Sequence, residues 1–151
     1  MQANSINITY NKKVKYEYFL EEHFEAGIVL KGTEIKSIRN GKIQLKESFI
    51  SIIDNEVYIK NMHISHYDKG NQFNHDETRE RKLLLNRSEI KKLKVKSQVS
   101  GYTIVPVSLY IKNGIAKLDI AIAKGKKLYD KRMVEKERDI QKMLRQASKN
   151  Y

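Results

Sequence analysis

The dipeptide Asn113-Gly114 constrains the fold more than any other feature of the sequence, because it separates two long β-type runs. These runs cover residues 102–111 and 115–123 and are rich in β-branched and alternating apolar residues. Asn-Gly is the preferred centre of a type I′ turn, since both central residues must accept positive φ. The pattern therefore predicts a long antiparallel hairpin. Pro106 has no N–H to donate, which predicts an edge position or a bulge in the first strand.

Two further segments carry β signals. Apolar residues recur at every second position through residues 16–30, which predicts a strand or a strand pair with one apolar side. Residues 48–53 and 56–62 are β-branched or aromatic runs joined by Asp54-Asn55, which can take positive φ. A second hairpin is expected there.

Two short helices are predicted between the strands. Thr33 can cap a helix over residues 33–39 that ends at Asn40-Gly41. Asn86 has an acidic residue three positions further on, which is the spacing of a capped helix from about residue 87 to 95. Residues 67–81 show no apolar periodicity and predict a long, mobile loop.

These elements contain no β-α-β alternation, so a mainly β fold is expected. The closest general architecture is a small antiparallel β-barrel of the oligonucleotide-binding type, with two or three short helices and a basic C-terminal tail. We expect two parts: a β-barrel body over residues 1–123 and a tail over residues 124–151. The tail has ten Lys or Arg against four Asp or Glu and only a narrow apolar stripe, which predicts that it is disordered when free.

The charge indicates the class of partner. The 151 residues include 30 Lys or Arg and 18 Asp or Glu, for a net charge of +12. Basic domains gain affinity for polyanions by releasing condensed counterions, so nucleic acid is the leading candidate, ahead of an anionic membrane or a merely solvated surface. There is no cysteine, which excludes disulfides, thiolate nucleophiles and zinc ribbons. No apolar run is long enough to span a bilayer, and a cytoplasmic protein without a membrane partner is expected.

Enzymatic interpretations find little support in the sequence. It contains no nucleophile elbow, paired metal motif or dinucleotide fingerprint, so we predict no catalytic residue, no bound metal and no cofactor. The best enzymatic alternative is a metal-dependent nuclease built from Glu25, Glu34 and Asp54. A second possible metal cluster has low specificity and consists of His63, His66, His75, Asp68 and Asp76.

Four segments then resemble, in order and spacing, motifs of the SsrA-binding protein family, also called small protein B. They are residues 24–27 (Phe-Glu-Ala-Gly), 32–42, 78–85 and 123–132, and the match runs from about residue 11 to residue 149. The resemblance implies an RNA-binding protein whose body binds the tRNA-like domain of transfer-messenger RNA (tmRNA). Its tail would enter the vacant mRNA channel of a stalled ribosome, so that the stalled peptide is tagged and released. Residues 133–147 are rich in good helix formers and contain no Gly or Pro, so we expect the tail to become helical in that channel.

The implied partners are tmRNA and the ribosome, through its small-subunit rRNA, decoding centre and mRNA channel. Elongation factor Tu would be an indirect partner through the charged RNA. The alternative is a basic ribosome-assembly or translation factor that binds ribosomal RNA alone. Co-purification of a small RNA charged with alanine would distinguish the two.

The resemblance also implies functional residues. RNA contact is attributed in the family to positions that correspond to Asn11, Glu25, Leu84 and Lys117. Cations within or beside the motifs complete the predicted RNA-binding set: Lys12, Lys13, Lys36, Arg39, Lys42, Arg79, Arg81 and Lys82. The predicted ribosome-binding residues of the tail are Lys124, Gly125, Lys126, Lys127, Tyr129, Asp130, Lys131, Arg132, Lys136, Arg138, Lys142 and Arg145.

Strand geometry predicts which way the side chains of Glu25 and Leu84 point. On a strand, Glu25 points away from Phe24 and Ala26 and toward the polar side, where a carboxylate can accept hydrogen bonds from a base or ribose. Residues 83–85 are three successive leucines, which cannot all face inward on one short element. We expect two in the core and Leu84 exposed. The chain departs from the family pattern at Tyr16 and Tyr129, where many or some members have His, so a titrating contact is not expected there.

Overall fold

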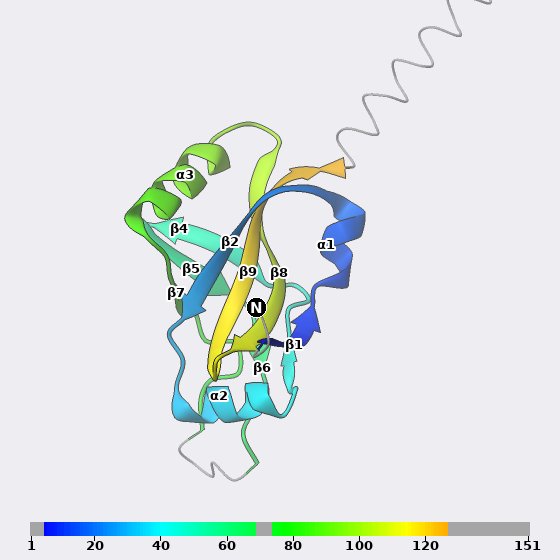
Figure 1. The fold of residues 1–151 in the computed structure, drawn as a ribbon, viewed down its shortest axis with the longest axis vertical. Coiled ribbons are helices and arrows are strands. Elements are labelled where there is room, and N and C mark those ends of the chain that lie inside the picture. The colour runs from blue at the N-terminus through cyan, green and yellow to red at the C-terminus, as the bar shows by residue number, and fades with distance from the viewer. Residues whose placement is uncertain (1–4, 69–73, 127–151) are drawn as a thin grey trace, which may run out of the picture.

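The computed structural model describes residues 5–68 and 74–126, and this part of the chain is mainly β with three helices (Figure 1). The strands are β1 (Ser5–Tyr10), β2 (Tyr18–Ile28), β3 (Ile43–Gln44), β4 (Phe49–Ile53), β5 (Glu56–Lys60), β6 (His63–Ile64), β7 (Arg81–Leu84), β8 (Tyr102–Lys112) and β9 (Ile115–Gly125). The helices are α1 (Lys12–Glu17), α2 (Gly32–Arg39) and α3 (Arg87–Ser97).

Seven strands form one antiparallel sheet in the order β1-β8-β9-β2-β7-β5-β4, and β3 pairs with β6 separately. The sheet curls, so that β4 and β5 lie behind β8 and β9 in Figure 1 and β4 approaches β8. Among the described residues no hydrogen-bonded ladder joins β4 to β1, so the sheet is open. The antiparallel, mainly β prediction is confirmed, whereas closure into a barrel is not.

Both predicted hairpins are present. Asn113 and Gly114 have φ values of 52° and 79°, as a type I′ turn requires, and Asp54 and Asn55 have φ values of 51° and 63°. The register of β8 against β9 shifts between Pro106 and Ser108, which confirms the bulge expected at the proline.

The core lies inside the curled sheet. Inward residues of β9, such as Leu118 and Ile120, belong to the same hydrophobic cluster as Ile59 of β5, and all three are completely buried. Helix α3 closes one end with Leu93 and α2 closes the other with Ile38 (Figure 1). Burying each of these side chains stabilises the fold by about 1.5–3 kcal/mol.

Helix α1 was not expected, since residues 16–30 suggested extended structure from Tyr16 onward. Its one buried side chain, Val14, packs on the outer face of the sheet against Val105, Val107, Ala121 and Ala123. A helix of six residues with a single buried side chain leaves almost no periodic signal, which explains why the sequence did not predict it.

The other two helices agree with prediction apart from one cap. Helix α3 begins after Asn86, whose backbone N–H donates to the Glu89 carboxylate at 3.0 Å, as expected. Helix α2 begins one residue earlier than expected, so Thr33 is not its cap. The Lys31 backbone N–H donates instead to Glu34 at 2.7 Å.

The predicted loop of residues 67–81 is fixed at its described ends. His75 is 2% exposed, and its Nε2 donates to the Ile64 carbonyl at 2.8 Å while its Nδ1 faces the Thr33 hydroxyl at 2.9 Å. Asn74 exchanges two hydrogen bonds with the Tyr67 backbone. Residues 69–73, and with them the prediction of mobility, lie outside the described residues.

Strand β9 continues to Gly125, so the sheet extends two residues beyond the expected end of the body at residue 123. The predictions of a free, disordered tail and of a helix on the ribosome concern residues that lie, from 127 onward, outside the described part. Within the described ranges, no helix is both long and apolar enough to cross a membrane.

Candidate RNA interface

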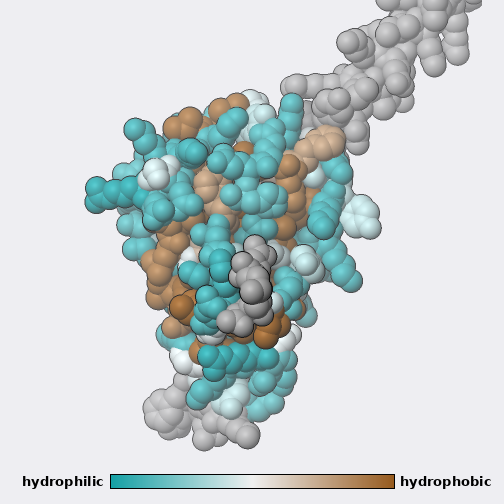
Figure 2. Space-filling view, in the orientation of Figure 1, coloured by the Kyte–Doolittle hydropathy of each residue, from teal (hydrophilic) through white to brown (hydrophobic). Residues whose placement is uncertain are grey.

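The outer face of β2, β9 and β8 has two halves of different chemistry. The half near the C-terminal end of β9 is apolar and covered by α1 through Val14. The other half, toward the Asn113-Gly114 turn, carries polar and charged side chains. Hydrophilic residues dominate much of this side of the molecule in Figure 2. No described helix packs on this second half, so a polyanion could reach the sheet there.

Strand register places predicted RNA-binding residues side by side on this half. Leu84 of β7 lies opposite Gly27 of β2, Gly27 opposite Lys117 of β9, and Lys117 opposite Tyr110 of β8. Paired residues of neighbouring strands share a face, so these four form one row across four strands, which we name the outer row. Glu25 is two residues from Gly27 and belongs to the same face.

Glu25 is held in place by groups from β8. The Tyr110 hydroxyl donates to its Oε2 at 2.6 Å, and Lys112 Nζ lies 3.5 Å from the same atom. The Tyr110 hydrogen bond, with the nearby charges of Lys112 and Lys117, outweighs partial burial and lowers the pKa of Glu25. Burial and the Glu25 charge raise the pKa of Tyr110 in turn. At neutral pH the surface therefore presents an ionised, oriented acceptor beside two lysines.

The three leucines divide as expected. Leu83 is 1% exposed and Leu85 packs partly against the core, whereas Leu84 is 53% exposed. Leu84 lies against Gly27: a Cβ at Gly27 would come within 3.2 Å of the Leu84 Cβ. The missing side chain at Gly27 thus makes room for an exposed apolar residue on an otherwise polar surface.

Sequence reasoning missed four members of this surface. Tyr110 and Lys112 bind Glu25, and His23 lies 3.0 Å from Asp119, the residue opposite Glu25. Two of the four could have been found. The Asn113-Gly114 turn fixes the pairing of Lys112 with Ile115 and hence of Tyr110 with Lys117.

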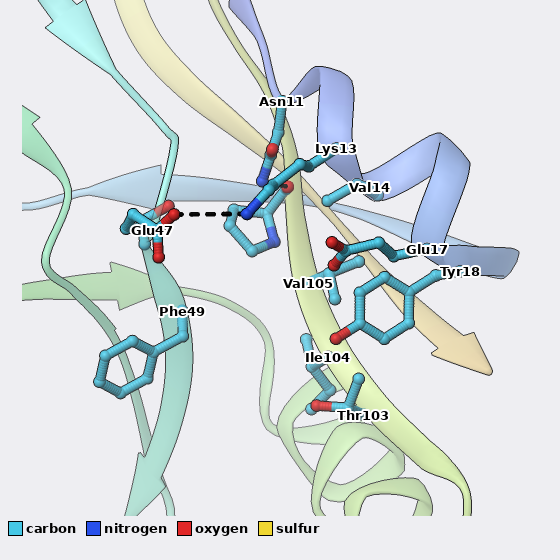
Figure 3. Close-up of a pocket in the computed structure, with 12 residues that line it drawn as sticks. Asn11, Lys13, Val14, Glu17, Tyr18, Glu47, Phe49, Thr103, Ile104 and Val105 are labelled. Atoms are coloured by element: carbon cyan, nitrogen blue, oxygen red, sulfur yellow. Dashed lines mark hydrogen bonds and ion pairs between the residues drawn. The ribbon is translucent and has the colours of Figure 1, made fainter. Parts of the chain in front are cut away.

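The predicted residues at the start of α1 lie outside the outer row. Asn11 donates through Nδ2 to the Pro106 carbonyl at 3.1 Å and through its backbone N–H to Val107 at 2.8 Å, so it anchors α1 to β8. Lys12 is exposed, and Lys13 lies 3.4 Å from the Glu47 carboxylate. Asn11 and Lys13 line a pocket between α1 and β4 (Figure 3).

Other predicted RNA-binding cations lie on α2 and just after it, at the same end of the sheet as the Asn113-Gly114 turn (Figure 1). Lys36, Arg39 and Lys42 are exposed. Lys36 Nζ lies 5.4 Å from the centre of the Tyr67 ring, and Lys42 is 2.9 Å from Asp68.

Arg81 requires a correction. Its side chain is completely buried, where it donates to the Glu34 carboxylate and, at 2.6 Å, to the Met62 carbonyl. A buried carboxylate needs such a partner, since an isolated ion away from water is strongly disfavoured. Arg81 therefore holds the fold together and does not reach the surface to bind RNA.

Its two predicted neighbours are more accessible. Arg79 also pairs with Glu34 and keeps 27% of its side chain exposed. Lys82 is 42% exposed and lies 3.3 Å from Glu56. The same geometry weakens the nuclease alternative, because Glu34 is fully engaged by two arginines. Nowhere in residues 5–68 or 74–126 do three His, Cys, Asp or Glu side chains gather as a metal site would need.

The described start of the tail lies beside aromatic rings. Lys124 Nζ is 6.0 Å from the Tyr102 ring centre, and Lys126 Nζ is 5.0 Å from that of Phe19 and 2.8 Å from the Lys15 carbonyl. Gly125 ends the strand, and a Cβ built on it would meet open space. The remaining predicted tail residues, from Lys127 to Arg145, lie outside the described ranges.

Most of the chain is similar to known proteins. A family model described as SmpB protein matches residues 8–150. The SsrA-binding protein of Geobacillus thermodenitrificans (strain NG80-2) is 54% identical over 140 residues, which cover 93% of this chain and 90% of that protein. That of Halothermothrix orenii is 49% identical over 148 residues, covering 98% and 96%. A solved structure described as "tmRNA-SmpB: a journey to the center of the bacterial ribosome" matches with a TM-score of 0.66 at 41% identity, covering 78% of this chain and 83% of the other.

Proposed function

The chain belongs to the SsrA-binding protein (SmpB) family, and from that premise we propose that it binds the tRNA-like domain of tmRNA and delivers this RNA to stalled ribosomes for trans-translation. The observation that carries the proposed binding surface is the outer row with Glu25. An apolar side chain, a fixed carboxylate and a lysine from three strands converge there on a sheet face that no described helix covers.

Each component suits RNA. Leu84 offers an apolar contact to a splayed base or ribose, and RNA modules use such surfaces for unstacked nucleotides. The ionised Glu25 accepts hydrogen bonds from base amino groups or ribose hydroxyls. Lys117 and Lys112 supply positive charge for the neighbouring phosphates. Lys12, Lys13, Lys36, Arg39, Lys42, Arg79 and Lys82 extend the positive surface on either side of the row.

The tail carries the second part of the proposal. Residues from Lys127 onward would bind the decoding centre and mRNA channel of the small subunit, and Lys124, Gly125 and Lys126 connect them to the sheet. Along β9, Lys117 and Gly125 are eight residues apart, which is roughly 25 Å of extended strand. The body and the tail would thus hold two different RNAs at the two ends of one strand.

The finer features of the proposal follow from the same premise. The protein acts as a binding partner without catalytic residues or cofactor, works in the cytoplasm, and meets elongation factor Tu only through the charged RNA. The curled sheet is compatible with a barrel of the oligonucleotide-binding type whose last seam, between β4 and β1, is not hydrogen-bonded.

The decisive experiment separates the two parts. A chain that ends at Lys126 should keep wild-type affinity for the isolated tRNA-like domain within about threefold, because its outer row is intact. The same chain should fail to support peptide tagging on stalled ribosomes. Full tagging activity of the shortened chain would contradict the proposed role of the tail.

Salt dependence tests the phosphate contacts. If about five phosphates are neutralised, affinity for the tRNA-like domain should fall at least tenfold over a fourfold rise in salt. A binding constant independent of salt would contradict the proposed interface. Recovery of ribosomal RNA alone with the purified protein, without an alanine-charged small RNA, would favour a ribosome-assembly factor instead.

A further inference from the structure

A pocket of about 220 Å³ opens between α1, the segment before β4, and β8 (Figure 3). Phe49 and Tyr18 lie on opposite sides of it, and the backbone and side chains of residues 103–106 form its floor. Pockets for drug-sized ligands begin at about 300 Å³, so this one suits a single small ring system. The outer row and the tail do not contribute to it.

Phe49 is available for stacking. It is the first residue of β4 and is 51% exposed, whereas Ile50 and Ile52 of the same strand pack against the core. Its ring contributes to neither hydrophobic cluster. An aromatic face beside a pocket gives a planar ligand a stacking surface.

Two carboxylates reach the pocket from opposite sides. Glu17 extends its carboxylate from α1 toward β8, beside Val105 and above the Tyr18 ring in Figure 3, and no described residue donates a hydrogen bond to it or pairs with it. Glu47 pairs with Lys13 at 3.4 Å. Glu17 is therefore an acceptor whose hydrogen-bonding capacity the described protein leaves unused.

The backbone at the pocket rim is unusual. Glu47 has φ of 66° although it is not glycine, and Asn61 Nδ2 donates to its carbonyl at 3.1 Å. Left-handed conformations of this kind cost about 1–3 kcal/mol and gather at ligand-binding sites. The conformation fixes where Glu47 and Lys13 meet at the edge of the pocket.

Lys13 lines this opening, and further lysines are close to its lining residues in the sequence. Lys12, Lys13 and Lys15 of α1 and Lys46 before Glu47 are all exposed. Lysines around an aromatic, acceptor-lined pocket match a ligand with phosphates outside and a flat, donor-bearing ring inside. That description fits one nucleotide of an RNA chain.

We propose that this pocket binds a single unstacked guanine base of an RNA partner, with the ring against Phe49 and the base edge on Glu17. The proposal rests on the proposed function only in taking RNA as the partner. Guanine alone presents two adjacent donors, N1–H and the N2 amino group, to the two oxygens of a carboxylate. Adenine and cytosine place a ring-nitrogen acceptor beside their amino group, and uracil flanks its N–H with two carbonyls, so each repels one carboxylate oxygen.

The test is an NMR titration of the full chain with three mononucleotides, GMP, IMP and UMP. GMP should shift the backbone amides of Phe49, Thr103 and Val105. IMP, which lacks only the N2 amino group, should bind about threefold or more weakly, the scale of one lost hydrogen bond. UMP should leave these amides unchanged. Since free nucleotides are used, the result does not depend on tmRNA binding.

Variants identify the residues. Phe49→Leu should weaken GMP binding about fivefold or more, as expected for a lost base–aromatic stack, while Phe49→Trp retains it. Glu17→Gln should abolish the preference for GMP over IMP. The matched controls are Ile53→Ala on the same strand and the exposed Glu80→Gln, neither of which should change binding. The amide spectrum itself reports whether each variant is folded.

Two results would overturn the proposal. One is equal shifts with all three nucleotides, centred on the lysines, which would mark phosphate binding alone. The other is the absence of any shift at Phe49, Thr103 and Val105 with GMP at millimolar concentration.

Discussion

Glu34 and Glu25 are both carboxylates with a lowered pKa, yet they lie in opposite environments. Glu34 is completely buried between α2 and β7, and Glu25 is 41% exposed on the outer sheet face. Burial alone would raise the pKa of Glu34, and hydrogen bonds from Arg79, the Lys31 backbone and Arg81 outweigh it. At Glu25 the Tyr110 hydroxyl is the main cause.

A glutamate carboxylate therefore serves the fold at Glu34 and the surface at Glu25. Around Glu34, water cannot replace a lost partner, so each partner is essential to the fold. Around Glu25, water can replace Tyr110 or Lys112, so the partners orient the carboxylate more than they stabilise the protein. Changes at the first site should alter stability, and changes at the second should alter RNA binding.

The largest effect is expected for Arg81→Met. The substitution leaves buried Glu34 with Arg79 as its only side-chain partner and should lower the free energy of unfolding by about 3–5 kcal/mol, measured by urea denaturation. The control is Lys82→Met, which removes a half-exposed ion pair with Glu56 and should change stability by less than about 1 kcal/mol. An equal loss of stability in Arg81→Met and Lys82→Met would show that the buried pair with Glu34 is no more important to the fold than the exposed pair with Glu56.

Arg81 also shows where sequence reasoning ends. It lies in a segment rich in cations, and a basic residue in such a motif suggests a phosphate contact. Its partner Glu34 is 47 residues away in the chain, and no local pattern joins the two. Charge patterns predict that a protein meets RNA, whereas only tertiary structure separates a cation that faces solvent from one that neutralises a buried acid.

The second comparison is between adjacent leucines. Leu83→Ala empties a core position and should lower the free energy of unfolding by about 2–5 kcal/mol. Leu84→Ala should leave the melting temperature near wild type and weaken binding to the tRNA-like domain by about 1–3 kcal/mol. Thermal denaturation and filter binding on both variants test this. A large loss of stability in Leu84→Ala would place that residue with the core instead.

Much of the fold was predictable, because its signals are local. The turns at Asp54-Asn55 and Asn113-Gly114 require positive φ, and Pro106 cannot donate to a ladder, so both hairpins and the bulge followed from the sequence. Strand β1 and helix α1 could not be predicted from the sequence. Their positions depend on pairing with β8 and on one valine against the sheet, contacts roughly 100 residues away in sequence that no short window contains.

Glu25→Ala should weaken binding to the tRNA-like domain by about 1–3 kcal/mol, the scale of a specific polar contact to a base. Its melting temperature should stay close to that of the wild type, because the side chain is exposed. Glu22→Ala is the matched control: Glu22 is on the same strand, is 51% exposed and pairs with Lys92. A similar loss of affinity in both variants would show a general charge effect instead of a contact at Glu25.

The smallest effect is expected for Tyr110→Phe, which removes the main cause of the lowered Glu25 pKa. Because that pKa is lower in the folded protein than in the unfolded chain, ionised Glu25 adds stability above about pH 4.3, the unfolded value, and this stability is lost as pH falls through the folded pKa. The variant should therefore be less stable than wild type at pH 7 by about 1 kcal/mol or less, since the pair is partly exposed. The difference should shrink as pH falls below the unfolded value and through the lower folded pKa of Glu25, and it should vanish once Glu25 is protonated in both proteins. Urea denaturation of both proteins at pH 7 and in acid measures it, and a difference that grows in acid would contradict the proposed hydrogen bond to an ionised Glu25.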